Sequence, residues 1–95
     1  HYNPTFWKGG ELDPTDVDGA MARAVAYSQN QYASVVDYVR RLDPNKPVHI
    51  GETGWASVSD GFYGPEGSRA SDEYKQALFY HGMREWTQTS GISCF

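Results

Sequence analysis

The sequence predicts an α/β fold in which the strands run parallel. Two long stretches, 16–42 and 71–90, carry apolar residues at three- and four-residue steps, as on one face of a helix. Each stretch is followed by a short apolar run, at 46–52 and at 92–95. Because helices alternate with strands in parallel sheets, this order indicates either an open sheet or a closed barrel.

Residues 1–19 are rich in Asn, Pro, Gly, Asp and Thr and have no sustained period, so we expect the end of a strand followed by a long loop. Asp16 or Asp18 can cap the helix that follows. Two arginines stand near its carbonyl end, where positive charge is favourable, and residues 43–45 form a turn. The predicted apolar stripe of this helix consists of Met21, Val25, Ser28, Tyr32, Val35, Val36, Val39 and Leu42.

The run 46–52 is short and mostly apolar, which is typical of a parallel strand buried on both faces. The connection 53–70 is longer than the usual roughly 2 to 6 residues, and long loops of this kind commonly form binding sites. Ser71 is predicted to cap a second helix, which Gly91 ends before the strand at 92–95. The predicted stripe of this helix consists of Tyr74, Ala77, Leu78, His81 and Trp86.

Charge and length restrict the classes of function. The net charge of −4 gives no support for binding to nucleic acid or to a membrane, and no apolar stretch approaches the roughly 20 residues of a membrane span. This net charge is better matched by a neutral polymer as the binding partner. The 95 residues fall well short of the roughly 250 of a complete eight-unit barrel, so we expect a fragment that needs the rest of its barrel. Cys94 cannot form an internal disulfide, and we expect it to be buried.

Glu52 is the sharpest catalytic candidate, because it is the last residue of the predicted strand. A carboxylate there is costly unless it is hydrogen-bonded or functional, and barrel enzymes place their chemistry at this end of the strands. Glycoside hydrolysis requires a second carboxyl group across the scissile bond. The other acids are expected on the surface or at helix starts, so we expect the partner upstream of His1. Among these acids are Glu11, Asp13, Asp60, Glu66, Asp72 and Glu73.

Three aromatic residues are candidates for sugar contacts. Trp55 can offer a face to a sugar ring or pack in its loop, and the two interpretations are equally weighted. Trp7 and Tyr2 would form an adjoining subsite if their strand is a neighbour. His1, His49 and His81 lack the spacing of metal ligands, and neither a phosphate loop nor a Gly-x-Ser-x-Gly elbow is present. We therefore predict neither a metal site nor a cofactor.

Residues 50–55, Ile-Gly-Glu-Thr-Gly-Trp, resemble the nucleophile strand of glycoside hydrolase family 17, the β-1,3-glucanase family. Residues 3–7, Asn-Pro-Thr-Phe-Trp, resemble the segment at the end of the preceding barrel strand, and residues 74–95 resemble the helix that leads into the last strand. The resemblance implies that residues 1–95 are the C-terminal portion of one catalytic (β/α)8 TIM barrel domain. They would extend from about the end of strand 6 to the start of strand 8.

The resemblance also implies an activity, which is endo-acting, retaining hydrolysis of laminarin-type β-1,3-glucan with Glu52 as nucleophile. Tyr2, Asn3, Trp7 and Trp55 would contact the polysaccharide or oligosaccharide, and the acid/base glutamate would lie outside the chain, so the isolated fragment is expected to be inactive. A β-1,3-glucanosyltransferase, another β-glycosidase and a non-catalytic glucan-binding module remain as alternatives. The size of such a substrate leads us to expect a secreted or periplasmic protein.

Overall fold

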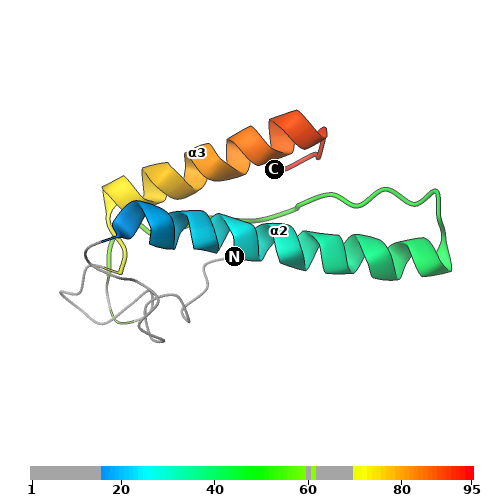
Figure 1. The fold of residues 1–95 in the computed structure, drawn as a ribbon, viewed down its shortest axis with the longest axis horizontal. Helices are drawn as coiled ribbons and strands as arrows, with labels where there is room; N and C mark the ends of the chain where they lie inside the picture. Colours follow the sequence, from blue (N-terminus) through cyan, green and yellow to red (C-terminus); the bar gives the residue numbers. More distant parts are fainter. Residues whose placement is uncertain (1–15, 60, 62–69) are drawn as a thin grey trace.

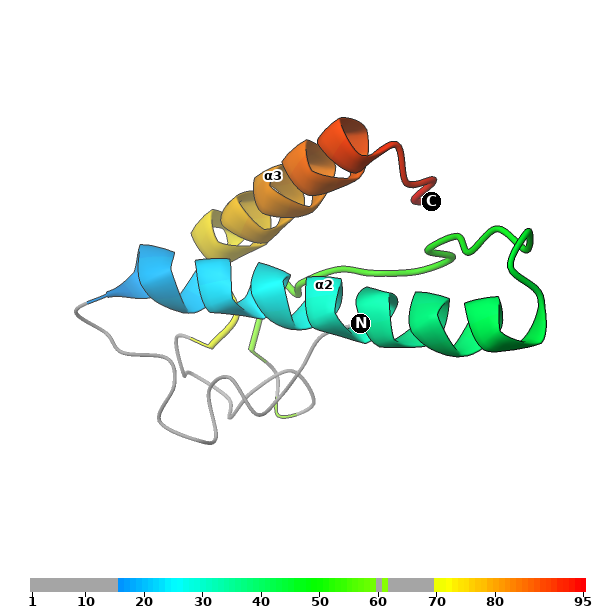
Figure 2. The ribbon, with the colours of Figure 1, turned by 45° about the vertical axis from the view of Figure 1, so that its right-hand side comes forward.

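The computed structural model describes residues 16–59, 61 and 70–95. Within these residues the chain forms two helices, α2 (Val17–Leu42) and α3 (Glu73–Ser90) (Figure 1). After α2 the chain turns back and runs alongside it, as the green segment of Figure 1 shows. Figure 2 shows α3 crossing over α2 at an angle, while the C-terminal end of α2 extends beyond it.

Helix α2 begins and ends where the sequence predicted. The Asp16 side chain caps it by accepting a hydrogen bond of 3.2 Å from the backbone N–H of Gly19. The last turn carries two arginines, and Asp43 is the C-cap residue. The predicted apolar stripe is buried only in its first half, at Met21 and Val25. Farther along, the exposed fractions rise, and Val35 and Leu42 are among the exposed residues.

Helix α3 begins one residue later than predicted. Its cap is Asp72, whose carboxylate accepts a hydrogen bond of 2.8 Å from the Lys75 backbone N–H, so the prediction that Ser71 caps this helix is wrong. The helix ends as expected at Gly91, which has a φ of 66° and donates its N–H to the Thr87 carbonyl. A left-handed C-cap favours glycine, because any Cβ at this φ is strained.

The buried face of α3 also differs from the predicted stripe. Tyr74, Ala77 and His81 are exposed. The buried positions follow each other at four-residue steps and are Lys75, Phe79, Met83 and Thr87. The physical reason is that α3 packs on two sides at once, against α2 and against the segment that contains Trp55.

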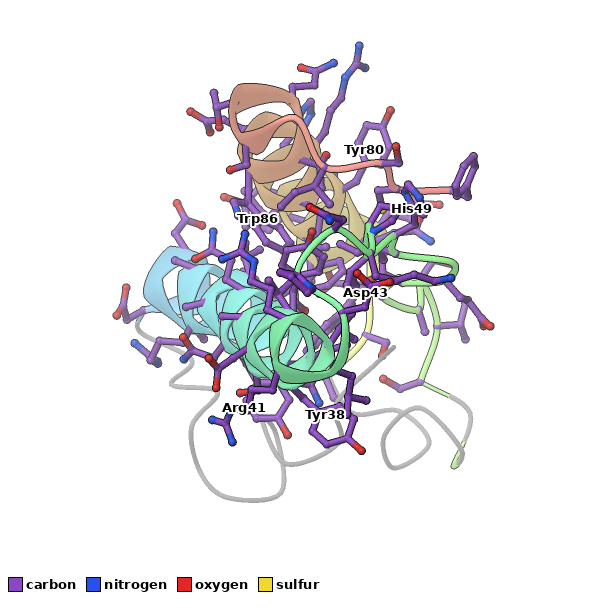
Figure 3. The ribbon with its side chains drawn as sticks, turned by 90° about the vertical axis from the view of Figure 1, so that its right-hand side faces the viewer. Tyr38, Arg41, Asp43, His49, Tyr80 and Trp86 are labelled. Carbon is purple, nitrogen blue, oxygen red and sulfur yellow. The ribbon has the colours of Figure 1, made fainter. Side chains whose placement is uncertain are left out.

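The two helices run in the same direction and meet along the first part of α2. Tyr74 of α3 donates a hydrogen bond of 2.8 Å to Asp18. Farther along, a Cβ at Gly82 would stand 2.7 Å from Cγ2 of Val25, so the helices are in close contact there. Figure 3 places Trp86 between the helices, and its ring centroid lies 5.5 Å from that of Tyr32. The core cluster consists of Met21, Ala24, Val25, Trp55, Phe79 and Met83.

The predicted α/β fold, a fragment of a (β/α)8 TIM barrel, is contradicted by this arrangement. The residues described contain two helices and no strand, and neither 46–52 nor 92–95 forms one. What remains of the expected pairing is one parallel bridge between Ile50 and Cys94. Pairing of two short segments is marginal without further strands beside them, and parallel pairing is the weaker kind. Within the described residues, the two predicted helices are present and the predicted strands are not.

Candidate active site

Glu52 lies between two fixed points of the backbone. Two residues before it, the Ile50 N–H donates to the Ser93 carbonyl at 2.9 Å, and the Phe95 N–H donates to the Ile50 carbonyl at 3.0 Å. Three residues after it, Trp55 enters the core. The Glu52 side chain itself is exposed, so the expected cost of a carboxylate at the end of a buried strand does not apply. An exposed carboxylate on an anchored backbone is accessible to a substrate.

Trp55 is a core residue in this structure. Its side chain is 5% exposed, and its ring centroid lies 5.7 Å from that of Phe79 at an interplanar angle of 38°. The indole N–H donates a hydrogen bond of 3.1 Å to the Ala70 carbonyl. Loop packing, one of the two interpretations of this residue, describes these contacts. Its predicted role in binding sugar stays a prediction.

Two hydrogen bonds join Ser59, within the predicted loop 53–70, to Ser71, which directly follows the loop. The Ser71 N–H donates to Ser59 Oγ at 3.0 Å, and Ser59 Oγ donates to the Ser71 carbonyl at 3.4 Å. Ala70 and Ser71 are both buried. Together with the bond from Trp55 to Ala70, these contacts fix the loop base against the core.

A groove of about 960 Å³ runs beside the candidate site, between α3 and the segments 53–55 and 92–95. Its walls combine apolar and polar side chains, among them Phe79, Tyr80 and Arg84. Thr53, the residue after Glu52, also lines it. The Thr53 hydroxyl oxygen is buried and has no hydrogen-bond partner among the residues described. A buried hydroxyl without a partner is costly, so this position is a candidate for a functional contact.

A buried cation stands at the start of α3. The Lys75 side chain is 5% exposed, and its ammonium group contacts the Asp72 carboxylate, which is 40% exposed. Partial burial alone would raise the pKa of Asp72, but hydrogen bonds from the Lys75 ammonium and backbone N–H, with the nearby positive charge, lower it below 3.8. This pair was not predicted from the sequence. An Asp followed three residues later by Lys at a helix start is the signal that was left unused.

The hydrogen bond between Tyr74 and Asp18 joins the starts of the two helices at the surface. It raises the pKa of the Tyr74 hydroxyl above 10.0, because the neighbouring carboxylate disfavours a second negative charge. This contact lies on exposed side chains, and we assign it to helix pairing rather than to chemistry.

Tyr2, Asn3 and Trp7 lie outside the described residues, so their sugar contacts stay predictions. His49 and His81 are exposed. Among the described positions, no three His, Cys, Asp or Glu residues are grouped so as to hold a metal ion. Neither α2 nor α3 has the length and apolar character that a bilayer crossing requires.

Comparisons with known proteins place this geometry in context. No protein-family model matches the chain, and no curated protein matches it. A crystal structure of an endo-laminarinase from Formosa Hel1_33_131 is similar, with 52% sequence identity and a TM-score of 0.79. The match covers 100% of this chain and 25% of that chain, so the chain spans a quarter of the length of the laminarinase. The likeness supports a relationship to glucanases.

Proposed function

We propose that this chain carries the catalytic nucleophile of a glycoside hydrolase that cleaves laminarin-type β-1,3-glucan. The observation that carries the proposal is the 52% identity to part of an endo-laminarinase over all of the chain. The exposed Glu52 between its two backbone anchors supplies a carboxylate that a polysaccharide can reach. We further propose that the family is glycoside hydrolase family 17, on the resemblance of residues 50–55.

The proposed mechanism is retaining and proceeds in two displacements. A carboxylate oxygen of Glu52 attacks the anomeric carbon and forms a glycosyl ester while the glycosidic bond breaks. A second carboxylic acid gives its proton to the leaving oxygen. In the second step this group, now a carboxylate, takes a proton from water, and the water oxygen displaces Glu52 from the sugar. We propose that the second group is a glutamate upstream of His1, so the 95 residues alone would be inactive.

The proposed substrate is a polysaccharide or oligosaccharide of β-1,3-linked glucose, contacted in addition by Tyr2, Asn3 and Trp7. A polymer of this size is met outside the cytoplasm, so we propose a secreted or periplasmic location. A glucanosyltransferase would form the same intermediate and pass it to a sugar acceptor instead of water. The products separate the two activities, because transfer lengthens some oligosaccharides and hydrolysis shortens all of them.

The test replaces Glu52 by Gln in the protein that carries this chain and measures reducing-sugar release from laminarin. Loss of the nucleophile should lower turnover by about 10³-fold or more, while laminarin binding is largely kept. Glu85→Gln is the matched control, because Glu85 is an exposed carboxylate on α3 that should leave turnover unchanged. Full turnover by Glu52→Gln would refute the proposed role.

A further inference from the structure

We infer that Trp55 is a positioning residue for Glu52, acting from the core through its indole N–H, and is not a surface on which sugar lies. The inference rests on the proposed function, since it concerns the same carboxylate. In this role Trp55 does not contact the substrate and instead holds the nucleophile in place.

Two glycines flank the backbone beside Glu52. Gly51 and Gly54 stand on either side of the Glu52–Thr53 pair, and a Cβ built at either glycine would meet nothing within 4 Å. Glycine also has the widest conformational freedom of any residue. Two contacts that hold this segment are the bridge at Ile50 on one side and the packing of Trp55 in the core on the other.

The anchor at Trp55 is specific in both contact and direction. Phe79 packs against the ring, and the Ala70 carbonyl receives the N–H, so the indole is held at its face and at its edge. Trp55 lines the groove, but at an exposure of 5% its ring offers little surface on which a sugar could lie. A small displacement of this anchor would pass along three residues to the carboxylate, and misplacement by about 1 Å can cost about 10²-fold in rate.

The experiment compares Trp55→Phe with Trp86→Phe in the protein that carries this chain. Trp55→Phe keeps a ring beside Phe79 and removes the N–H donor. Trp86→Phe makes the same change in a half-buried ring, which packs against Tyr32. We measure kcat and KM on laminarin, together with the midpoint of thermal unfolding. Should Trp55→Phe fail to fold, Phe79→Leu loosens the same ring contact and takes its place.

The expected result is a fall in kcat of about tenfold or more in Trp55→Phe, with KM changed by less than about twofold. Trp86→Phe should keep the kcat of the parent even if its midpoint of thermal unfolding falls as far as that of Trp55→Phe. A higher KM at unchanged kcat would make Trp55 a sugar platform and overturn the inference. Equal losses of kcat in the two variants would also overturn it. If Glu52→Gln stays active, the proposed function fails instead, independently of either tryptophan.

Discussion

Lys75 is the clearest case in which a single residue depends on one neighbour. Its side chain is almost fully covered, and the charge is compensated by Asp72. Asp72 also caps α3 through the Lys75 backbone N–H, so one carboxylate satisfies a helix terminus and a buried charge. A buried charge left without its partner is strongly destabilising, whereas replacing a buried ion pair by apolar side chains is often neutral.

Three substitutions in this pair should therefore lower the free energy of unfolding by different amounts. Asp72→Ala should lower the free energy of unfolding by more than the roughly 1 kcal/mol of a lost cap, since it also leaves the Lys75 ammonium without its carboxylate. Asp72→Asn keeps a capping oxygen and should lose less. Lys75→Met removes the charge and should cost the least. Urea unfolding of the three variants measures the order, and a larger loss in Lys75→Met than in Asp72→Ala would contradict it.

The Asp72–Lys75 pair should make the folding stability depend on pH in the acidic range. The pKa of Asp72 is lower in the folded chain than its ordinary value of 3.8, so the folded state favours the carboxylate. The stabilisation is present above pH 3.8 and is lost as the pH falls through the lowered value. Parent and Asp72→Asn should therefore differ in stability at neutral pH and converge below that range. A constant difference down to the lowest pH would argue against this linkage.

At the scale of elements, the contact between α2 and α3 depends on the absence of a side chain at Gly82. Alanine in a helix interior is usually more stable than glycine by about 1 kcal/mol. Here its Cβ would stand 2.7 Å from Cγ2 of Val25, a buried branched side chain. Overpacking of this kind costs roughly 1 to 3 kcal/mol. The helix crossing therefore favours glycine against the local preference of the helix.

Gly82→Ala should lower the unfolding temperature in the parent chain and raise it in a Val25→Ala background, where the space is open. Thermal unfolding of the parent, the two single variants and the double variant forms a mutant cycle. The change of sign is the expected signature of direct contact. Additive effects would show that the two helices do not meet at this position.

On the scale of the whole molecule, the covered and open parts of α2 differ sharply. The helix has 26 residues, or about 39 Å, whereas α3 has 18 residues, or about 27 Å. The first half of α2 lies under α3, while Tyr38 and Leu42 in the second half are 64% and 72% exposed. Figure 3 shows Tyr38 and Arg41 pointing from α2 away from α3.

Hydrogen exchange should reveal this difference. Amides of residues 35–42 should exchange at least about tenfold faster than those of residues 20–25, because few buried contacts protect the second half. The chain can be measured by mass spectrometry with peptides from each half of α2. Equal protection of both halves would show that another surface covers the second half.

The sequence by itself determined the features that depend on residues close together in the chain. Asp16 caps α2 and Gly91 ends α3, because a side-chain oxygen and a left-handed backbone work within one helical turn. The alternation of helices with apolar runs was also visible. It led to a predicted barrel fragment whose strands the described residues do not form, since pairing depends on segments far apart in the sequence.

Only the tertiary structure decided which faces and side chains are buried. Trp55 enters the core because Ala70 and Phe79, 15 and more residues away, receive its N–H and its ring. Lys75 is buried against the expectation for a charged residue, since Asp72 stands beside it. Periodicity shows that a helix has an apolar face, but the free energy of packing depends on which surfaces meet, and that is settled only when distant segments come together.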